Sequence, residues 1–530
     1  MRGLLTSSIG VTCAAALTLP PAVLNAPSAA AAPAERTTTT TLQGSTQSLP
    51  LTPRTRERVL GRTPEQGVYS TDVRHFSLVG VIWDNPGTEL GGRVQVRTRA
   101  AATGRWSGWQ DVETRNADHG ADPGTAEAAS GRVHGATAPL WVGDSNGVDV
   151  RVRAGEGKAG GGGGGDAADA GPGGRPSTGG PDPLPAGLRL ELVDPGGPGD
   201  ESPLDGPAPL GLPADSPSAD GPSVDSPSAD GPSADGPSVD GPSADGPSVD
   251  GPSADGPSAD GPSVDGPSVD GPSVDGPSVD GAGTADDASA DVNAGLAPVD
   301  ATEIPALNRK DTELELEELT GVDVSRGKPY IGPRPKIVTR RGWGADESLR
   351  EKGFVYTGKI KAAFVHHTAS GNGYRCSEAP SVIRSIYRYH VVSMGWRDIG
   401  YNFLVDKCGT IYEGRAGGVT KAVRGAHTLG FNNNSMGIAV IGTYGSHQPS
   451  SAAVTAVAKL TAWKLGLFGA NPKGKTYLKS GGGNLYPKGK NVRLNVISGH
   501  RDGYATECPG AKLYAKLGSA RTSSARLQGR

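Results

Sequence analysis

The chain has few of the residues that fill a large hydrophobic core. Of its 530 residues, 5% are aromatic, three are methionine and four are cysteine, whereas 82 are glycine and 44 are proline. Glycine and proline at this level approach the share typical of extensive low-complexity sequence. The length allows two or three domains, but the composition predicts that much of the chain does not pack.

Long apolar runs are also missing beyond the N-terminus. No later stretch of about 18 apolar residues could form a membrane-spanning helix. At the N-terminus, Arg2 precedes an apolar run, Leu4–Leu24, that two prolines interrupt, and Ala29–Ala32 offers small residues for cleavage. This pattern is typical of a cleaved signal peptide over residues 1–32, although a retained membrane anchor is the alternative. We therefore expect a secreted, cell-wall-associated protein without stable membrane insertion.

The few cysteines fit export. Cys13 lies in the predicted signal peptide, and no CxxC or HxxxH spacing indicates a closed structural zinc site. In an oxidising compartment Cys376 and Cys408 can pair, which leaves Cys508 for a metal ion. Three unpaired buried thiols are the alternative.

A low-complexity repeat divides the chain. Residues 216–281 repeat the unit Gly-Pro-Ser-Ala/Val-Asp, which brings one aspartate and no large side chain per unit. Such a unit cannot bury enough apolar area to offset its ordering entropy. We predict a disordered linker over residues 196–335, with a short acidic helix at Glu313–Glu318, and a disordered segment over residues 33–65.

Net charge separates the two ends of the chain. From Lys328 onward there are 31 lysines and arginines against 9 aspartates and glutamates, a balance of +22, which leaves −26 for the remainder. A basic domain is drawn to polyanions. For an exported protein an anionic wall polymer is a better partner than nucleic acid, which we do not expect to bind. The alternative is a surface charge that only keeps the protein in solution.

Two folded domains are predicted, one all-β and one α/β. Over residues 66–195, short runs of alternating apolar and polar residues favour a small β-sandwich with a glycine-rich insertion at 155–180. Residues 336–520 mix strands with two amphipathic helices and form one α/β unit, followed by a basic tail, 521–530. The expected strands and helices are 76–83, 93–99, 148–153, 188–193, 360–366, 379–392, 401–405, 410–413, 438–441 and 451–467.

Two separated motifs carry metal-binding residue types. His500 and Cys508 lie eight residues apart around a glycine-containing loop, and His366 follows a buried apolar run. Two imidazoles and a thiolate are good zinc ligands, and three protein ligands leave a fourth position open, as in catalytic zinc sites. The alternative is that each is a buried core residue.

Five motifs in order resemble the peptidoglycan recognition protein family. They are 364–369, 396–405, 412–415, 425–432 and 498–510. The pattern is similar to the zinc-dependent N-acetylmuramoyl-L-alanine amidase branch, which includes phage T7 lysozyme, and it covers about a third of the chain. The layout outside it resembles exported amidases of Gram-positive actinobacteria such as Streptomyces.

The resemblance implies a central mixed β-sheet flanked by helices, with a Zn²⁺ ion at the floor of a groove. It also implies a role for each matching residue. The metal ligands are His366, His500 and Cys508; the catalytic residues are Tyr401 and Thr506; the substrate-binding residues are His367, Trp396, Arg415, His427 and Asn432. For several of these a structural role is the alternative: His367 in the core, Trp396 as packing, Arg415 as surface charge and Asn432 as a turn cap.

The expected activity is hydrolysis of the amide between the muramyl lactyl group and L-alanine of peptidoglycan stem peptides. The expected cofactor is Zn²⁺, the expected partner is peptidoglycan, and nothing in the sequence demands an oligomer. The alternatives are a receptor that binds peptidoglycan without cleaving it and a structural protein attached to the wall.

Overall fold

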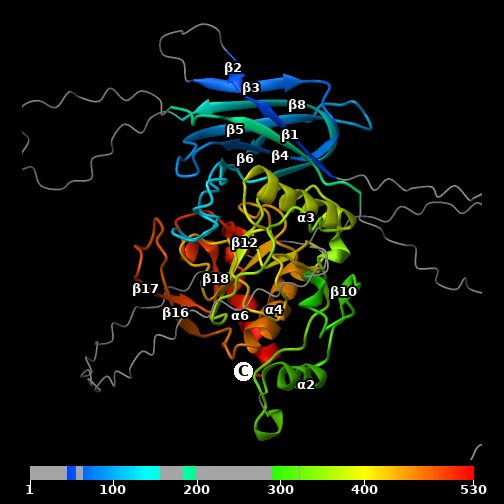
Figure 1. Ribbon diagram of the computed structural model, residues 1–530, viewed down its shortest axis with the longest axis vertical. Coiled ribbons are helices and arrows are strands. Elements are labelled where there is room, and N and C mark those ends of the chain that lie inside the picture. The colour runs from blue at the N-terminus through cyan, green and yellow to red at the C-terminus, as the bar shows by residue number, and fades with distance from the viewer. Residues whose placement is uncertain (1–43, 55–63, 156–182, 198–288, 322) are drawn as a thin grey trace, which may run out of the picture.

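The computed structural model describes residues 44–54, 64–155, 183–197, 289–321 and 323–530, which form an N-terminal β unit stacked on a C-terminal α/β unit (Figure 1). The predicted signal peptide, the glycine-rich insertion after Gly155 and the 216–281 repeat lie outside the described residues, as does most of 33–65. Among the described residues, no helix is long and apolar enough to cross a membrane.

The N-terminal unit is an antiparallel sheet that folds over its own core. Its strands are β1 (Ser45–Pro50), β2 (Thr52–Pro53), β3 (Glu65–Ser70), β4 (Phe76–Trp83), β5 (Gly92–Ala100), β6 (Gln110–Val112), β7 (Gly135–Ala136), β8 (Leu140–Ala154) and β9 (Arg189–Asp194). The first part of β8 pairs with β4 and the rest pairs with β3 and β5, so this long strand joins both layers. Val81, Val96, Val150 and Leu190 are almost fully buried between the layers. The predicted all-β sandwich is confirmed.

The sandwich begins earlier in the chain than predicted. β1 and β2 fall within the segment 33–65, for which the prediction of disorder is wrong at these residues. β1 pairs with β9 along its whole length, from Ser45 opposite Asp194 to Pro50 opposite Arg189. The hydrogen bonds of this distant partner form the strand, since the local sequence is polar and has little strand propensity.

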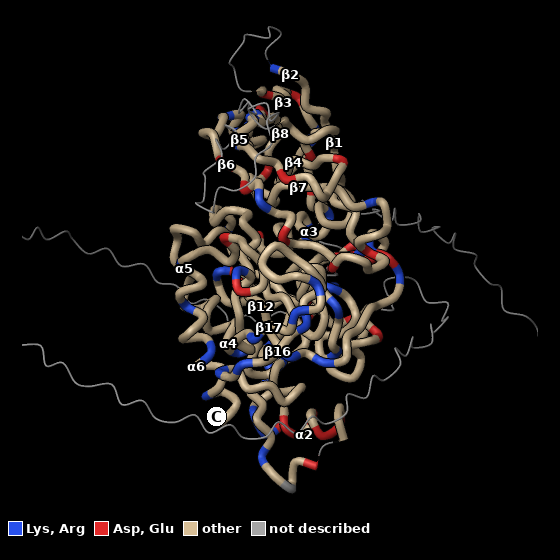
Figure 2. Tube along the Cα trace, turned by 90° about the vertical axis from the view of Figure 1, so that its left-hand side faces the viewer, with Lys and Arg blue, Asp and Glu red and all other residues tan. Residues whose placement is uncertain are grey.

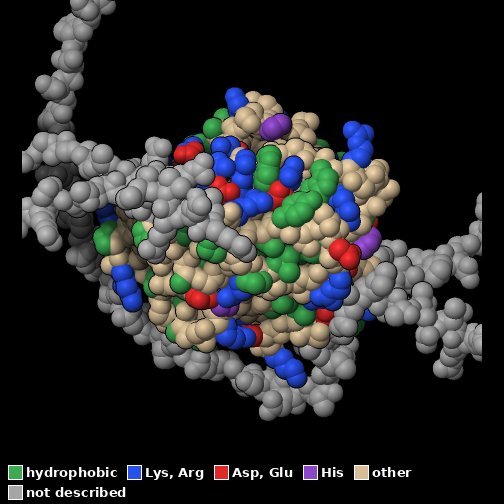
Figure 3. All heavy atoms as spheres, turned by 90° about the horizontal axis from the view of Figure 1, so that it is seen from above, with side chains coloured by type: hydrophobic (Ala, Val, Ile, Leu, Met, Phe, Trp, Pro, Cys, Tyr) green, Lys and Arg blue, Asp and Glu red, His purple; other side chains and the backbone are tan. Residues whose placement is uncertain are grey.

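The tryptophans of the sandwich divide between core and surface. Trp83 is 2% exposed and belongs to the core. The indoles of Trp106 and Trp109 instead lie against the guanidinium of Arg97, and Arg151 covers Trp109. Seen from above, the outer end of the sandwich carries arginine side chains interspersed with hydrophobic ones (Figure 3).

A seven-stranded mixed sheet forms the centre of the C-terminal unit, which confirms the α/β prediction. In spatial order the strands are β10 (Glu303–Ile304), β11 (Ile337–Val338), β14 (Ile411–Glu413), β13 (Phe403–Val405), β15 (Ser435–Val440), β12 (Ala362–His367) and β18 (Ile497–Gly499). β12 runs parallel to both of its neighbours. A separate hairpin is formed by β16 (Lys475–Lys479) and β17 (Asn491–Asn495).

Helices cover both faces of this sheet. α4 (Ser451–Gly466) and α6 (Leu517–Gln528) share a core with Val365 and Ile438, and α5 (Ala511–Tyr514) precedes α6. α3 (Ala379–Arg388) continues into a wider turn, Tyr389–Ser393, and packs with Leu404 and Ala439 on the other face. The two long helices lie at the predicted positions.

The segment before this unit is folded over residues 289–321 and 323–335, so the prediction of a disordered linker is wrong there. The predicted acidic helix exists as α2 (Arg309–Thr320), and β10 pairs with β11. Ile304 and Ile331 are fully buried, and Arg334 forms an ion pair with Glu315. A few well-placed apolar residues thus anchor a segment whose overall composition is polar.

The prediction that residues 521–530 form a basic tail is also wrong, because most of these residues belong to α6. Thr461 of α4 donates a hydrogen bond from its hydroxyl to that of Ser524, 3.1 Å away, and Ala520 and Ala525 are buried. Small side chains allow the two helices to approach closely, and their apolar surface is too small to stand out in the sequence.

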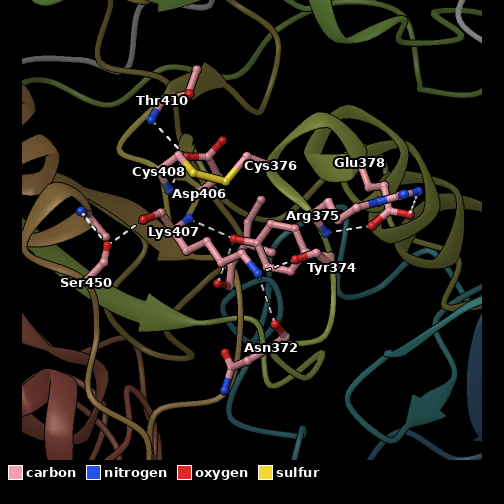
Figure 4. Close-up of a disulfide and its surroundings, with 12 residues drawn as sticks. Asn372, Tyr374, Arg375, Cys376, Glu378, Asp406, Lys407, Cys408, Thr410 and Ser450 are labelled. Atoms are coloured by element: carbon pink, nitrogen blue, oxygen red, sulfur yellow. Dashed lines mark hydrogen bonds and ion pairs between the residues drawn. A yellow bond between two sulfur atoms is a disulfide. The ribbon is translucent and has the colours of Figure 1, made fainter. Parts of the chain in front are cut away.

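Cys376 and Cys408 form the predicted disulfide (Figure 4). Cys508 is free and buried. Lys407, next to Cys408, donates its backbone N–H to the hydroxyl of Tyr374 at 2.8 Å. Its ammonium group donates to the carbonyl of Asn372 at 3.2 Å. Hydrogen bonds therefore join the same two segments as the disulfide.

The two units share an apolar core. Leu78, Ile82 and Val193 of the sandwich are at most 3% exposed and pack in one cluster with Ile386 and Tyr389 of the C-terminal unit. Tyr389 also donates a hydrogen bond to the carbonyl of Thr137, 3.1 Å away. A Cβ at Gly80 would lie 2.3 Å from the Tyr389 hydroxyl, so this approach requires glycine.

Candidate metal centre

Sheet topology brings the three predicted metal ligands together. His366 is the last residue but one of β12, and His500 directly follows β18, in the single turn His500–Asp502. Because these strands are parallel neighbours, with Val365 opposite Gly499, their carboxyl ends meet at one edge of the sheet. Cys508 returns to this edge through the loop that follows.

The ligand atoms lie close to one another and are shielded from solvent. The rings of His366 and His500 are 4.5 Å apart between centroids, and Cys508 Sγ is 3.8 Å from His366 Nδ1. The two imidazoles are fully buried, and Cys508 is 3% exposed. Together with His119, each of these residues offers a ligand atom within 4.8 Å of all the others. Sequence reasoning missed His119.

The second ring nitrogen of each predicted histidine ligand is held by a neighbour. His366 Nε2 lies 3.3 Å from His427 Nδ1 and 3.4 Å from the Thr428 hydroxyl. His500 Nε2 lies 3.1 Å from the backbone carbonyl of Asp118. His500 Nδ1 is buried and has no hydrogen-bond partner within the described part of the chain. Such outer hydrogen bonds orient histidine ligands toward a metal ion.

The ionisation of these groups also fits a metal site. Burial, followed by the nearby His500 and His427, lowers the pKa of His366 well below its usual value, and burial lowers the pKa of His500 to about 3. Both rings are therefore neutral, which is the form that binds metal. Burial raises the pKa of the Cys508 thiol, and a bound cation would favour its thiolate. The donor set of two imidazoles and one sulfur suits zinc.

The predicted catalytic residues line a small pocket beside this centre. Tyr401, Thr506, His367 and Cys508 contribute to its wall, together with residues of the N-terminal unit. The Tyr401 ring lies 5.5 Å from that of His366. Thr506 accepts a hydrogen bond at its hydroxyl from the backbone N–H of Cys508, at 3.2 Å, and the backbone N–H of His367 donates to Cys508 Sγ at 3.4 Å.

The other predicted substrate-binding residues lie in two environments. His427 contacts the metal centre through His366 and is fully buried. Trp396 is 4% exposed, and its ring packs 4.5 Å from that of His390, between centroids. Asn432 caps the turn after His427 by accepting from its backbone N–H at 2.7 Å.

Arg415 and Asn432 also bind a segment of the N-terminal unit. This segment, residues 113–134, connects β6 to β7 and is called the groove loop below. It descends from the sandwich to the carboxyl ends of β12 and β18 (Figure 1). A connection of 22 residues without helix or strand is long for a compact domain, and such loops are usually functional. The length of this connection was therefore the one feature of the sequence that could have indicated a functional role for His119.

The chain shares its C-terminal unit with known proteins. Residues 356–511 match the family described as N-acetylmuramoyl-L-alanine amidase. Peptidoglycan-recognition protein SC2 of Drosophila melanogaster is 30% identical over 184 residues, which are 34% of this chain and 84% of that protein. The chain belongs to the peptidoglycan-recognition protein family. Peptidoglycan-recognition protein 1 of Holotrichia diomphalia is likewise 30% identical over 187 residues, 34% of this chain and 79% of that protein.

Solved structures of peptidoglycan recognition proteins also match about a third of the chain, 34% in each case below. Drosophila PGRP-LB is 28% identical, with 34% of this chain and 92% of that chain covered and a TM-score of 0.27. Peptidoglycan recognition protein-LE in complex with tracheal cytotoxin is 28% identical over the same shares, with a TM-score of 0.28. Residues 29–178 match a different family, described as Rv3811 N-terminal galactose-binding domain-like.

Proposed function

We propose that the protein is a secreted, zinc-dependent N-acetylmuramoyl-L-alanine amidase that cleaves the amide between the muramyl lactyl group and L-alanine of peptidoglycan. The observation that carries this proposal is the buried cluster of His366, His500 and Cys508, whose ligand atoms lie within 4.8 Å of one another. Membership of a family that includes amidases supports the substrate class.

The residues around the centre have complementary tasks. Zinc bound there would polarise the scissile carbonyl and make a water molecule more acidic. Tyr401 keeps its phenolic proton, because burial, with Cys508 and Asp118 nearby, holds its pKa well above the usual value. It can therefore donate a hydrogen bond to the oxygen that becomes negative during hydrolysis. Thr506 lines the same pocket, and His427 fixes the orientation of His366.

Secretion and wall association are supported by separate features. The signal-like N-terminus and the disulfide between Cys376 and Cys408 fit an oxidising compartment outside the cytoplasm. Lysines and arginines are frequent around α6, β16 and β17, whereas acidic residues gather on α2 (Figure 2). We infer that the basic surface attracts anionic wall polymers, an attraction that salt would weaken.

The decisive test is product analysis on purified peptidoglycan. The zinc-loaded chain and its His119→Ala variant are compared, because His119 lies against the centre. New L-alanine amino termini without new reducing sugar ends, and their loss in Cys508→Ser, are expected. Wall binding without new amino termini in both proteins would refute the amidase and favour a receptor that binds only. New reducing ends would indicate cleavage of the glycan instead.

A further inference from the structure

The groove loop places a histidine of the N-terminal unit at the metal centre. The His119 ring lies 4.6 Å from that of His500 and 5.4 Å from that of His366, between centroids. Its side chain is 8% exposed, and its Nδ1 lies 2.9 Å from a carboxylate oxygen of Asp118. Its Nε2 is buried and, among the described residues, has no hydrogen-bond partner.

This arrangement of His119 repeats that of the other ligands. One ring nitrogen is held by a neighbour, and the second is left without a partner next to Cys508, His366 and His500. A zinc ion with three protein ligands retains an open position for water or substrate, whereas four protein ligands close it. With His119 the cluster has a closed donor set of three imidazoles and one sulfur.

Two carboxylates of the same loop bind the residues that the family resemblance assigns to substrate. Asp122 accepts hydrogen bonds from the side-chain amide of Asn432 at 2.7 Å and from the backbone N–H of Gly430 at 2.8 Å. Glu127 forms a two-pronged ion pair with Arg415, at 3.0 and 2.9 Å. The carbonyl of Gly120 accepts from the same Asn432 amide at 2.8 Å.

These contacts are buried and keep solvent from the residues that the family resemblance assigns to substrate. Asp122 is 5% exposed and Arg415 is 6% exposed. The pocket that remains between the groove loop and Tyr401 has room for about a single water molecule and not for a muramyl-peptide. Because the loop ends in β6 and β7, the sandwich fixes both of its ends.

We propose that the protein is latent in this conformation, because the groove loop fills the substrate groove and His119 supplies the fourth metal ligand. The proposal builds on the metal-dependent amidase proposed above. A muramyl-peptide or another polyanionic wall fragment would have to displace Asp122 and Glu127 from their partners before the centre opens to it.

The first test counts histidine ligands in the intact zinc-loaded chain by X-ray absorption. Wild-type protein should show three imidazoles and one sulfur, and His119→Ala should show two imidazoles, one sulfur and one light-atom ligand. His75→Ala is the matched control, because His75 lies on the same unit with a side chain that is 64% exposed. Two imidazoles in the wild type, or identical spectra for wild type and His119→Ala, would overturn the metal part of the proposal.

The second test opens the groove loop without removing His119. The double variant Asp122→Asn/Glu127→Gln keeps the size of both side chains, but it removes both charges and replaces one acceptor oxygen of each with an amide N–H donor. Asp72→Asn/Glu89→Gln is its control at exposed positions. The double variant should release zinc to a chromogenic chelator about tenfold faster than the wild type. It should also hydrolyse a soluble muramyl-peptide about tenfold faster, since a site open in fewer than about a tenth of molecules loses that factor. The control should match the wild type.

The two tests separate the latency proposal from the amidase proposal. If ligand count and zinc release change as expected but no variant produces new amino termini, the amidase proposal fails and the closed centre stands. If all variants hydrolyse at the wild-type rate with unchanged zinc release, latency fails and the amidase stands. If His119→Ala does not fold, the rate of zinc release from the double variant still tests the latency proposal.

Discussion

Removing the disulfide should destabilise the C-terminal unit by an amount that follows from the loop it closes. Cys376 and Cys408 are separated by 32 positions. In the chain-entropy view, a cross-link over a loop of this length restricts the unfolded chain by about 3.5 kcal/mol. For a unit of this size, each kcal/mol corresponds to about 2–4 °C in melting temperature, which predicts a loss of about 10 °C.

The folded state should survive this loss, because other contacts join the same segments. Lys407 donates to the Tyr374 hydroxyl and to the Asn372 carbonyl, and Ser450 donates from its hydroxyl to the carbonyl of Lys407 (Figure 4). The disulfide therefore acts mainly on the unfolded chain, and the variant without it should keep the native hydrogen bonds.

The assay is thermal unfolding of the full chain, followed by circular dichroism. Cys376→Ala/Cys408→Ala is compared with the wild type, and Ser377→Ala serves as the control because its side chain is exposed beside Cys376. Substitution is preferable to a reducing agent, since thiol reagents also compete for zinc at Cys508. A melting temperature within about 2 °C of the wild type would refute the reasoning. A loss much greater than about 10 °C, together with loss of the native hydrogen bonds, would refute it as well.

Four further outcomes are expected. Cys508→Ser should lose most bound zinc and all hydrolysis while the sandwich stays folded, measured by metal analysis and circular dichroism. Tyr401→Phe, made in the His119→Ala background, should keep full zinc content while kcat falls about a hundredfold, as for the loss of an oxyanion donor. Burial raises the pKa of Glu413 from its ordinary 4.5 to about 7. Between about pH 4.5 and 7, the folded state therefore binds a proton at Glu413 that the unfolded state has lost. For this reason, Glu413 makes the free energy of unfolding fall as pH rises through this range. Glu413→Gln should remove that part of the slope in urea unfolding. Deletion of residues 216–281 should leave hydrolysis of a soluble muramyl-peptide unchanged, since the centre is built from residues outside the repeat.

Each of these outcomes has a clear opposite. Unchanged zinc binding in Cys508→Ser would remove the thiolate from the ligand set. A wild-type rate in Tyr401→Phe would remove the phenol from the mechanism. An identical pH slope in Glu413→Gln would mean that Asn293 and Arg340, which donate to this carboxyl group, keep it ionised. Loss of hydrolysis on deleting the repeat would assign it more than a spacer role.

The elements that sequence predicted correctly are those whose own residues carry the signal. The strand over residues 76–83 was predicted from its short, mostly apolar run, and the helix over residues 451–467 from apolar residues that recur at helical spacing. The metal ligands were predicted from residue types that suit zinc and from five ordered motifs that resemble a known family, and the structure places two of them at neighbouring strand ends. In each case the local pattern and the tertiary structure agree.

The elements that sequence missed depend on distant partners. β1 exists through its pairing with β9, and α6 packs through small residues on α4. His119 lies nearly 250 positions before His366, on a loop of another unit, and no spacing relates the two. The packing of the sandwich on α3 and the loop's own contacts with Asn432 and Arg415 bring that loop to the metal centre, and no spacing in the sequence shows this.

The two parts of the interface between the units differ in chemistry, and this difference determines how a latent centre could open. Leu78, Ile82 and Val193 bury apolar surface against α3, and separating them would expose that surface to water, at about 25 cal/mol for each Å². The groove loop contacts the C-terminal unit through hydrogen bonds and ion pairs, notably of Asp122 and Glu127, with Ala121 and Val133 packed against the shared apolar cluster. Charged and polar groups of a wall fragment can replace such contacts one for one. Opening by exchange at the groove loop therefore costs less than separating the units, and the apolar contact keeps the loop close enough to return.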